Sequence, residues 1–228
     1  MQDNYIDSLL GNPPLSFVDR LREQFQERYN LIVHHEWMID LLNSKLTFEQ
    51  FEAFVSQESY IYDLLARKLI SLALESTDDE YEDLMKVGFF LYSEGCENRK
   101  SLDTPQALLL SCPTEQYVAT LNKVWRTSST NNIQKLLTIL STLWIREGIH
   151  QLLNTESYRS QFPVWTDIMA TVNPQEHIMK LSKMINQAFE ELLEVESRSC
   201  AEAQQELEHL LSNLTQFELL IRNHAYQP

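Results

Sequence analysis

The chain has few of the residues that make turns, with only 4 Gly and 7 Pro among its 228 residues. Sandwiches, barrels and propellers connect many short strands through such turns, so this scarcity argues against them and favours long helices. Hydrophobic residues make up 43% of the chain and charged residues 22%, which is ordinary for a globular protein.

Basic residues and long hydrophobic runs are also scarce. Lys and Arg number 18 against 33 Asp and Glu, which gives a formal net charge of −15. A surface with this charge repels phosphates, so we expect neither nucleic acid nor a membrane surface as a partner. No apolar run approaches the roughly 20 residues of a membrane span, and we expect no secretory signal at the first residues.

Cysteine is rare, and the three residues Cys96, Cys112 and Cys200 lie far apart. An odd number with no C-x-x-C pair predicts neither a disulfide framework nor a thiolate zinc site. The expected location is therefore the reducing cytoplasm.

Apolar residues recur at helical spacing along most of the chain, which predicts an all-α fold. Thr47 and Gln50 have the spacing of a capping box and mark the start of one long helix. The pattern gives about seven or eight helices in one domain over residues 1–228. The expected helices cover residues 15–42, 47–76, about 80–92, 112–125, 133–153, 174–192 and 201–225, with a loop at 95–105 and a connector or short helix at 154–163.

A first candidate site lies in the helix that Thr47 opens. Glu58, Tyr62 and Leu65 share one face of that helix, and the face is otherwise apolar. A carboxylate in such a place is costly unless it is paired or functional. Two interpretations stay open here: a functional carboxylate, or a Glu at the edge of a buried stripe.

A second candidate is Glu218 in the last predicted helix, between Phe217 and Leu219. Apolar surroundings raise the pKa of a carboxyl group, which suits general acid or base chemistry. The alternative interpretation is a salt-bridged Glu.

A metal site has weaker support. Glu147 and His150 have the E-x-x-H spacing of di-iron bundles, but such a site needs a second motif and two further carboxylates. Glu206 and His209 share the spacing on a strongly charged face that we assign to the surface. We therefore expect no metal and no cofactor. No phosphate-binding glycine motif and no G-x-S-x-G motif is present, so neither nucleotide binding nor serine hydrolysis is predicted.

Several short motifs follow one another from about residue 30 to the C-terminus. They are His35, Leu46-Thr47-Phe48-Glu49-Gln50-Phe51, Phe54-Val55-Ser56-Gln57-Glu58-Ser59-Tyr60, Pro113-Thr114 with Tyr117, the helix around Trp144, Trp165, and Phe217-Glu218 with Ala225-Tyr226. In this order they resemble the thiaminase II (TenA) family. The resemblance implies a heme-oxygenase-like helical bundle with an inter-helix pocket for aminopyrimidine compounds. It also implies the family's hydrolytic site, which uses a Cys nucleophile, an Asp, Tyr residues and a C-terminal Glu.

Compared residue by residue with that family, the site is altered. Glu218 matches the family's Glu, Glu58 stands where the family has Asp, and Tyr117 is similar to its stacking Tyr. Thr142 occupies the position of the Cys, and Met169 that of a second Tyr. A Thr hydroxyl has no accessible anion at neutral pH, so the resemblance does not extend to Cys-dependent hydrolysis.

Taken together, these residues predict a divergent TenA-like protein that binds a small nitrogen heterocycle, related to aminopyrimidine or thiamin. Whether Cys96 or Cys112 replaces the missing nucleophile, and whether the site is catalytic, stays open. Two alternatives are an oxidase or oxygenase of the same fold, similar to the pyrroloquinoline quinone biosynthesis enzymes, and a non-catalytic protein that binds a partner. The candidate catalytic residues are Glu218 and Glu58, and the candidate binding residues are Tyr117, Thr142, Tyr62 and Met169.

The resemblance also implies a homodimer or homotetramer. The sequence adds a motive of its own, because Trp37, Phe48, Trp125 and Phe162 lie near expected helix ends, where one small core does not cover them all. Exposed aromatic patches usually mark interfaces.

Overall fold

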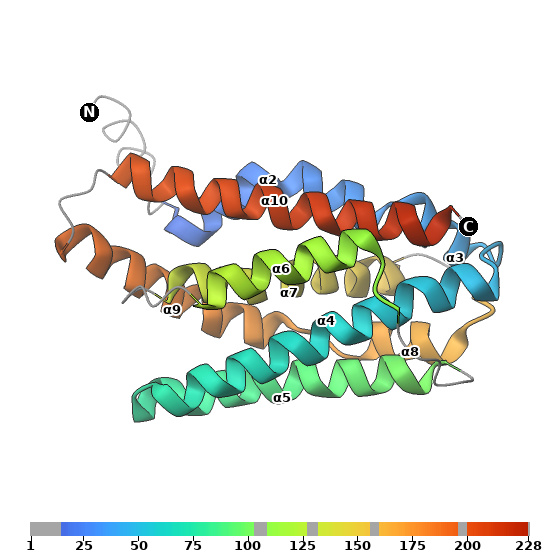
Figure 1. Ribbon diagram of the computed structural model, residues 1–228, viewed down its shortest axis with the longest axis horizontal. Helices are drawn as coiled ribbons and strands as arrows, with labels where there is room; N and C mark the ends of the chain where they lie inside the picture. The colour runs from blue at the N-terminus through green and yellow to red at the C-terminus, as the bar shows by residue number, and fades with distance from the viewer. Residues whose placement is uncertain (1–14, 103–108, 127–131, 156–159, 196–199, 228) are drawn as a thin grey trace.

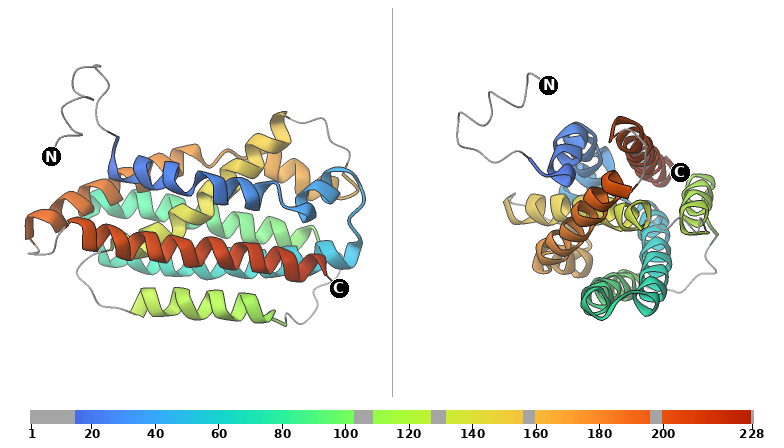
Figure 2. Two further views of the ribbon diagram at one scale, coloured as in Figure 1. Left: turned by 90° about the horizontal axis from the view of Figure 1, so that it is seen from above. Right: turned by 90° about the vertical axis from the view of Figure 1, so that its left-hand side faces the viewer.

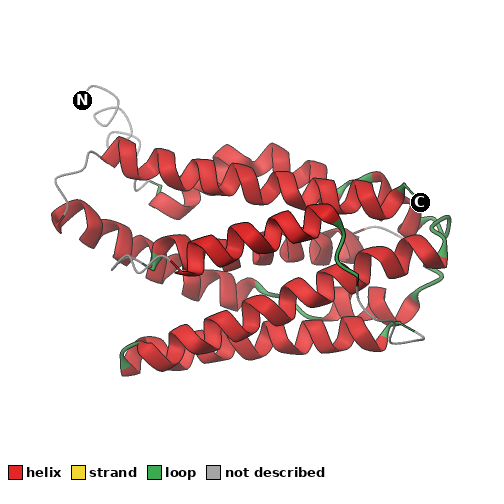
Figure 3. Ribbon diagram, in the orientation of Figure 1, coloured by secondary structure: helices red, strands yellow, loops and turns green. Residues whose placement is uncertain are grey.

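The computed structural model describes residues 15–102, 109–126, 132–155, 160–195 and 200–227. Within these ranges the regular structure is entirely helical (Figures 1 and 3), which confirms the all-α prediction. Nine helices are described where seven or eight were expected, partly because the first predicted helix is two helices. They are α2 (Phe17–Val33), α3 (Glu36–Leu42), α4 (Phe48–Glu75), α5 (Asp78–Lys100), α6 (Cys112–Arg126), α7 (Ile133–Thr155), α8 (Pro163–Thr171), α9 (Gln175–Val195) and α10 (Cys200–Tyr226).

Helix α7 is the central element of the fold. Every residue from 136 to 147 is buried, as expected for a helix that is apolar nearly all round. It crosses its neighbours obliquely (Figure 2) and contacts α2, α6, α8, α9 and α10. Helices α4 and α5 form an antiparallel hairpin on one side of the molecule, and α2 and α10 lie on the opposite side (Figure 1).

The capping box at the start of α4 is present as predicted. The Thr47 hydroxyl accepts the Gln50 N–H at 3.2 Å, and the Gln50 side-chain oxygen accepts the Thr47 N–H at 3.0 Å. This satisfies two donors that the first helical turn leaves unpaired. The start of α4, and hence the register of Glu58 and Tyr62, is set by this local sequence.

The predicted helix over residues 15–42 is wrong in one respect, because the chain breaks at His34 and His35. The His35 Nδ1 accepts the Trp37 N–H at 3.1 Å and so caps a new helix, α3. Ser, Thr, Asp and Asn usually perform this role. A histidine cap inside an uninterrupted apolar pattern gives no recognisable signal.

The predicted loop at residues 95–105 is also wrong in its first part, since α5 continues to Lys100. Gly95 lies inside the helix, where α5 approaches α4 closely. A Cβ on Gly95 would lie 2.8 Å from Asp63 Oδ1 and 3.2 Å from the Ser59 carbonyl oxygen. The glycine therefore permits helix packing and does not end the helix.

The four aromatic residues expected near the surface are covered by the chain itself. Trp37 is completely buried, and Phe48, Trp125 and Phe162 are partly buried. Phe162 stacks on Phe51 with ring centroids 3.9 Å apart. These residues therefore give no argument for an interface. Among the described residues, no helix combines the length and apolarity needed to cross a bilayer.

Candidate functional site

One small internal cavity gathers four of the six predicted site residues. Glu58 and Tyr62 reach it from α4, Thr142 from α7 and Glu218 from α10. Its volume is about 10 Å³, roughly what a single water molecule requires. The remaining lining residues are Phe54, Ile61, Ile145, Ile221 and Arg222.

Helical spacing explains how so few elements build this cavity. Glu58 and Tyr62 are four residues apart on α4, and Glu218 and Arg222 are four residues apart on α10, so each pair projects from one face. Helices α4 and α10 contact each other, and α10 also contacts α7. Thr142 lies in the buried part of α7, residues 136–147, and donates its hydroxyl to the Thr138 carbonyl at 3.2 Å.

Glu58 is the less well paired of the two carboxylates. Its only hydrogen bond among the described residues comes from the Asn98 side-chain amide of α5, at 3.1 Å. Burial raises its pKa to about 7, with the Arg222 charge opposing the rise and the Glu218 charge adding to it. Near neutral pH this group is therefore divided between acid and carboxylate, which is the condition for proton transfer at physiological pH.

Glu218 is held by its own helix. Arg222 Nη1 donates to Glu218 Oε2 at 2.7 Å and to the Glu218 carbonyl at 3.2 Å. The guanidinium carbon lies 4.8 Å from the centroid of the Phe54 ring, and Arg222 is 1% exposed. Of the two interpretations left open for Glu218, the structure supports the salt-bridged carboxylate.

The two tyrosines differ in their relation to the cavity. Tyr62 lines it, whereas Tyr117 of α6 is buried beside it and stacks on Phe217 with centroids 5.9 Å apart. Burial raises the pKa of both phenols well above the usual value, and the Glu58 charge adds to the rise for Tyr62 and the Glu218 charge for Tyr117. Both phenols are therefore neutral hydrogen-bonding groups.

Met169 does not line the cavity. It is buried in α8, and its main-chain carbonyl accepts a hydrogen bond from Arg146 Nη1 at 2.8 Å. Arg146 also donates from Nε to Glu94 Oε2 at 2.6 Å, and both side chains of this ion pair are buried. Sequence reasoning missed these two residues, although an Arg four residues after Thr142 in an apolar helix is a detectable signal, because a buried charge needs a partner.

Glu147 and His150, the E-x-x-H pair of α7, interact with different side chains. Glu147 forms an ion pair with Arg22 of α2, and the His150 ring lies 3.4 Å from the Asn154 amide. No group of three or more His, Cys, Asp or Glu side chains in the described parts of the chain is arranged to hold a metal ion.

No protein-family model matches this chain, and no curated protein matches its sequence. Solved structures do match. A TenA homologue from Pyrococcus furiosus superposes with a TM-score of 0.75 at 14% identity, over 92% of this chain and 100% of that one. This chain has the TenA-like fold.

Two further solved structures are also similar to this chain. A TenA homologue from Pyrococcus horikoshii gives a TM-score of 0.71 at 17% identity, over 93% of this chain and 99% of its own. A Sulfolobus solfataricus protein, provisionally described as a TenA-like thiaminase, gives 0.69 at 14% identity over 92% and 96%. At these identities the likeness establishes the fold alone.

Neither cysteine left open as a substitute nucleophile lines the cavity of this TenA-like fold. Cys96 lies on α5 with its sulfur 3.2 Å from Arg99 Nη2, and Cys112 is exposed at the start of α6. The Thr142 hydroxyl does line the cavity, and it donates a hydrogen bond to the Thr138 main-chain carbonyl.

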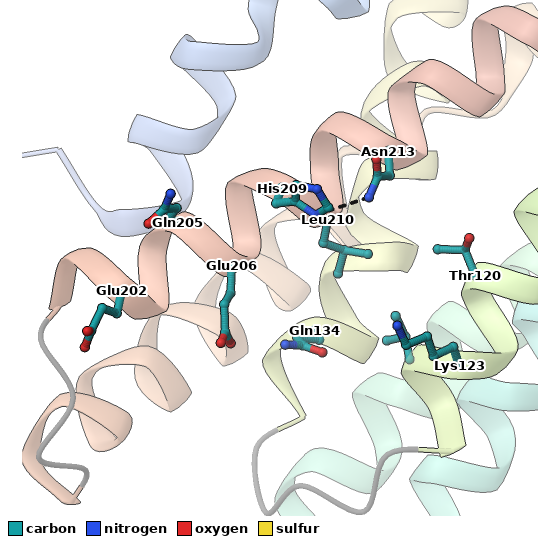
Figure 4. Close-up of a pocket in the computed structure, with 10 residues that line it drawn as sticks. Thr120, Lys123, Gln134, Glu202, Gln205, Glu206, His209, Leu210 and Asn213 are labelled. Carbon is teal, nitrogen blue, oxygen red and sulfur yellow. Dashed lines mark hydrogen bonds between the residues drawn. The ribbon is translucent and has the colours of Figure 1, made fainter.

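A much larger groove, of about 760 Å³, lies on the surface between α6, α7 and α10 (Figure 4). Exposed polar groups line much of it, including His209, whose Nδ1 lies 3.2 Å from the Asn213 amide. Glu206 and His209 belong to this groove, in agreement with their assignment to the surface. None of the predicted site residues lines it, so the internal cavity remains the candidate site.

Proposed function

We propose that this chain binds a small nitrogen heterocycle, related to aminopyrimidine or thiamin, between Glu58 and Glu218. The observation that carries the proposal is the convergence of two carboxylates from different helices on one internal cavity. A carboxylate accepts two adjacent N–H donors at once, which is the pattern that an amino group next to a protonated ring nitrogen presents. The TenA-like fold supports this choice of ligand class.

The ligand needs more room than the cavity has, and Arg222 is the group whose movement would supply it. Its guanidinium is planar, is paired with Glu218 and lies over the Phe54 ring. A protonated aminopyrimidine makes the same two interactions, a charged hydrogen bond and a contact with an aromatic face. Arg222 Nε has no partner among the described residues, so displacement would break the Nη1 bonds to Glu218 and the contact with Phe54, and the ligand would replace the side-chain interactions.

We infer that binding proceeds without covalent hydrolysis of the thiaminase kind. Thr142 donates its hydroxyl proton to the Thr138 carbonyl, which is not a base. The Glu218 carboxylate is occupied by Arg222. A serine or threonine nucleophile needs an adjacent general base, and neither the Thr138 carbonyl nor the paired Glu218 carboxylate serves as one.

Calorimetric titration with a 4-aminopyrimidine and with thiamin tests the proposal. We expect binding by the natural chain and a loss of affinity of tenfold or more in Glu58→Gln. Glu49→Gln is the matched control, because Glu49 is exposed on the same helix and does not line the cavity. Absence of binding by the natural chain at millimolar ligand rejects the proposal.

A second candidate is a non-catalytic protein that keeps the scaffold to bind a partner. The specific observation in its favour is that two buried arginines, Arg146 and Arg222, occupy the interior and leave room for about one water. Arg222→Ala separates the two candidates. If only this variant binds the heterocycle, the natural interior is closed and the second candidate is favoured.

A further inference from the structure

A further pocket lies between α2 and α7, where the two helices cross (Figure 2). Its volume is about 290 Å³, near the lower end of the range for small-molecule sites. It shares no lining residue with the internal cavity or with the surface groove between α6, α7 and α10. We call it the α2–α7 pocket.

Two buried aromatic side chains form the inner wall of the α2–α7 pocket. Tyr29 of α2 and Trp144 of α7 meet edge to face, with ring centroids 5.4 Å apart. One turn further along both helices the backbones approach closely, because a Cβ on Gly148 would lie 2.6 Å from Val33 Cγ2. The apolar wall is therefore held in place by packing between two helices.

Two side chains of this pocket are hydrogen-bond donors with unused capacity. The Trp144 indole N–H is buried without a partner among the described residues, which is unfavourable unless another molecule accepts the bond. Arg22 donates from Nη2 to Glu147, and its guanidinium carbon lies 5.9 Å from the centroid of the Trp144 ring. The other N–H groups of Arg22 have no acceptor in the part of the chain that the structure describes. Because an indole and a guanidinium only donate, their ligand must be an acceptor.

The charges around the α2–α7 pocket favour an anion with one negative charge. Although the chain has a formal net charge of −15, no Asp or Glu of the described ranges lines this pocket. Exposed Asn30 and Gln151 add neutral amide groups to the lining. Arg22 is the only Lys or Arg among the described lining residues, and Glu147 already offsets part of its charge. A single carboxylate therefore suits the site better than a phosphate ester, which carries nearly two charges at pH 7.

We propose that the α2–α7 pocket binds a small organic monocarboxylate that carries an aromatic or other apolar group. The carboxylate accepts hydrogen bonds from Arg22 and from the Trp144 indole, and the apolar group lies against Tyr29 and Val33. This is a second site, separate from the one proposed between Glu58 and Glu218, and it does not depend on that function.

Titration with benzoate, observed through the indole N–H signals of ¹⁵N-labelled protein, tests the ligand class. We expect the Trp144 signal, identified by its absence in Trp144→Phe, to move and saturate at millimolar benzoate. Benzamide has the same shape without the charge and should bind at least tenfold more weakly. No saturable movement of the Trp144 signal, or equal binding of benzamide, overturns the proposal. Tighter binding of phenyl phosphate than of benzoate overturns the assignment of a monocarboxylate.

Calorimetric titration of variants with benzoate tests the position of the site. Arg22→Gln/Glu147→Gln leaves no unpaired buried charge and should bind at least tenfold more weakly, with unchanged helical circular dichroism. Trp144→Phe keeps an aromatic ring but removes the donor, so it should weaken binding several-fold. Arg20→Gln is the matched control, because Arg20 is exposed on the same helix and does not line the pocket. Glu58→Gln should also bind as the natural chain does, since it alters only the internal cavity. Natural affinity in both pocket variants, or an equal loss in either control, overturns the proposal.

Discussion

The two sides of the cavity contain the same functional group in different electrostatic settings. Glu58 on α4 receives one hydrogen bond from an uncharged amide, and burial raises its pKa to about 7. Glu218 on α10 is bound by a guanidinium at 2.7 Å. The residue four positions later on each helix explains the difference. Tyr62 follows Glu58 on α4, and Arg222 follows Glu218 on α10. Two carboxylates in similarly apolar sequence can therefore have different roles, and the residue four positions later distinguishes them.

The strongest test of this comparison removes the partner of Glu218. Arg222→Leu leaves a buried carboxylate without its counter-ion, and we expect the free energy of unfolding to fall by about 3–5 kcal/mol. Urea denaturation at pH 7 measures this. The double variant Glu218→Leu/Arg222→Leu should recover most of the loss, since it buries no charge. An unchanged stability in the single variant means that Glu218 has another partner or access to water.

The next test uses Glu58, which has no charged partner. Its folded pKa of about 7 lies above the 4.5 of an unfolded glutamate. Below about pH 4.5 both states are protonated, and as pH rises from there to about 7 the folded state alone retains the proton, so stability falls. Above about pH 7 the full cost remains, roughly 3–4 kcal/mol at about 1.4 kcal/mol per pKa unit.

Glu58→Gln removes this pH dependence. We expect the variant to lie within about 1 kcal/mol of the natural chain in stability at pH 5 and to be more stable by about 3 kcal/mol at pH 8, measured by urea denaturation at each pH. Glu49→Gln, on the exposed side of α4, should show no such divergence. A difference between natural chain and Glu58→Gln that stays constant with pH contradicts the raised pKa.

The smallest expected effect concerns Asn98. Its amide donates to Glu58 and so favours the ionised form, while its own Oδ1 has no partner among the described residues. In Asn98→Leu the pKa of Glu58 should rise further, moving the pH at which stability falls upward by less than about one unit. The same denaturation series measures this. A downward movement means that Asn98 does not stabilise the carboxylate.

The sequence predicts the fold well where the signal is local. The capping box at Thr47 fixes α4, and the apolar spacing defines α7 and α10. The prediction fails where the deciding contact comes from another helix. Gly95 resembles a loop residue in the sequence, and only its close approach to α4 shows why a glycine stands inside α5.

The candidate site shows the same contrast between local signals and contacts from distant helices. Glu58, Tyr62, Thr142 and Glu218 were expected together, and they line one cavity. Arg146 and Glu94 were missed because their pairing joins α7 to α5, residues 52 positions apart. The family resemblance predicts Met169 at the site, but its main-chain carbonyl accepts a hydrogen bond from Arg146, and its side chain does not line the cavity.

The central claim is that Glu58, which has no ion-pair partner among the described residues, is the carboxylate available to a ligand. Its most direct test is a pH titration of the Glu58 side-chain carbon by NMR. With ¹³C-labelled glutamate, the Glu58 carboxyl signal is identified by its absence in Glu58→Gln. We expect a midpoint near pH 7 in the free protein, and a lower midpoint with saturating 4-aminopyrimidine, because donation from the ligand favours the carboxylate. A midpoint in the ordinary range near 4.3 that the ligand does not move would contradict the account.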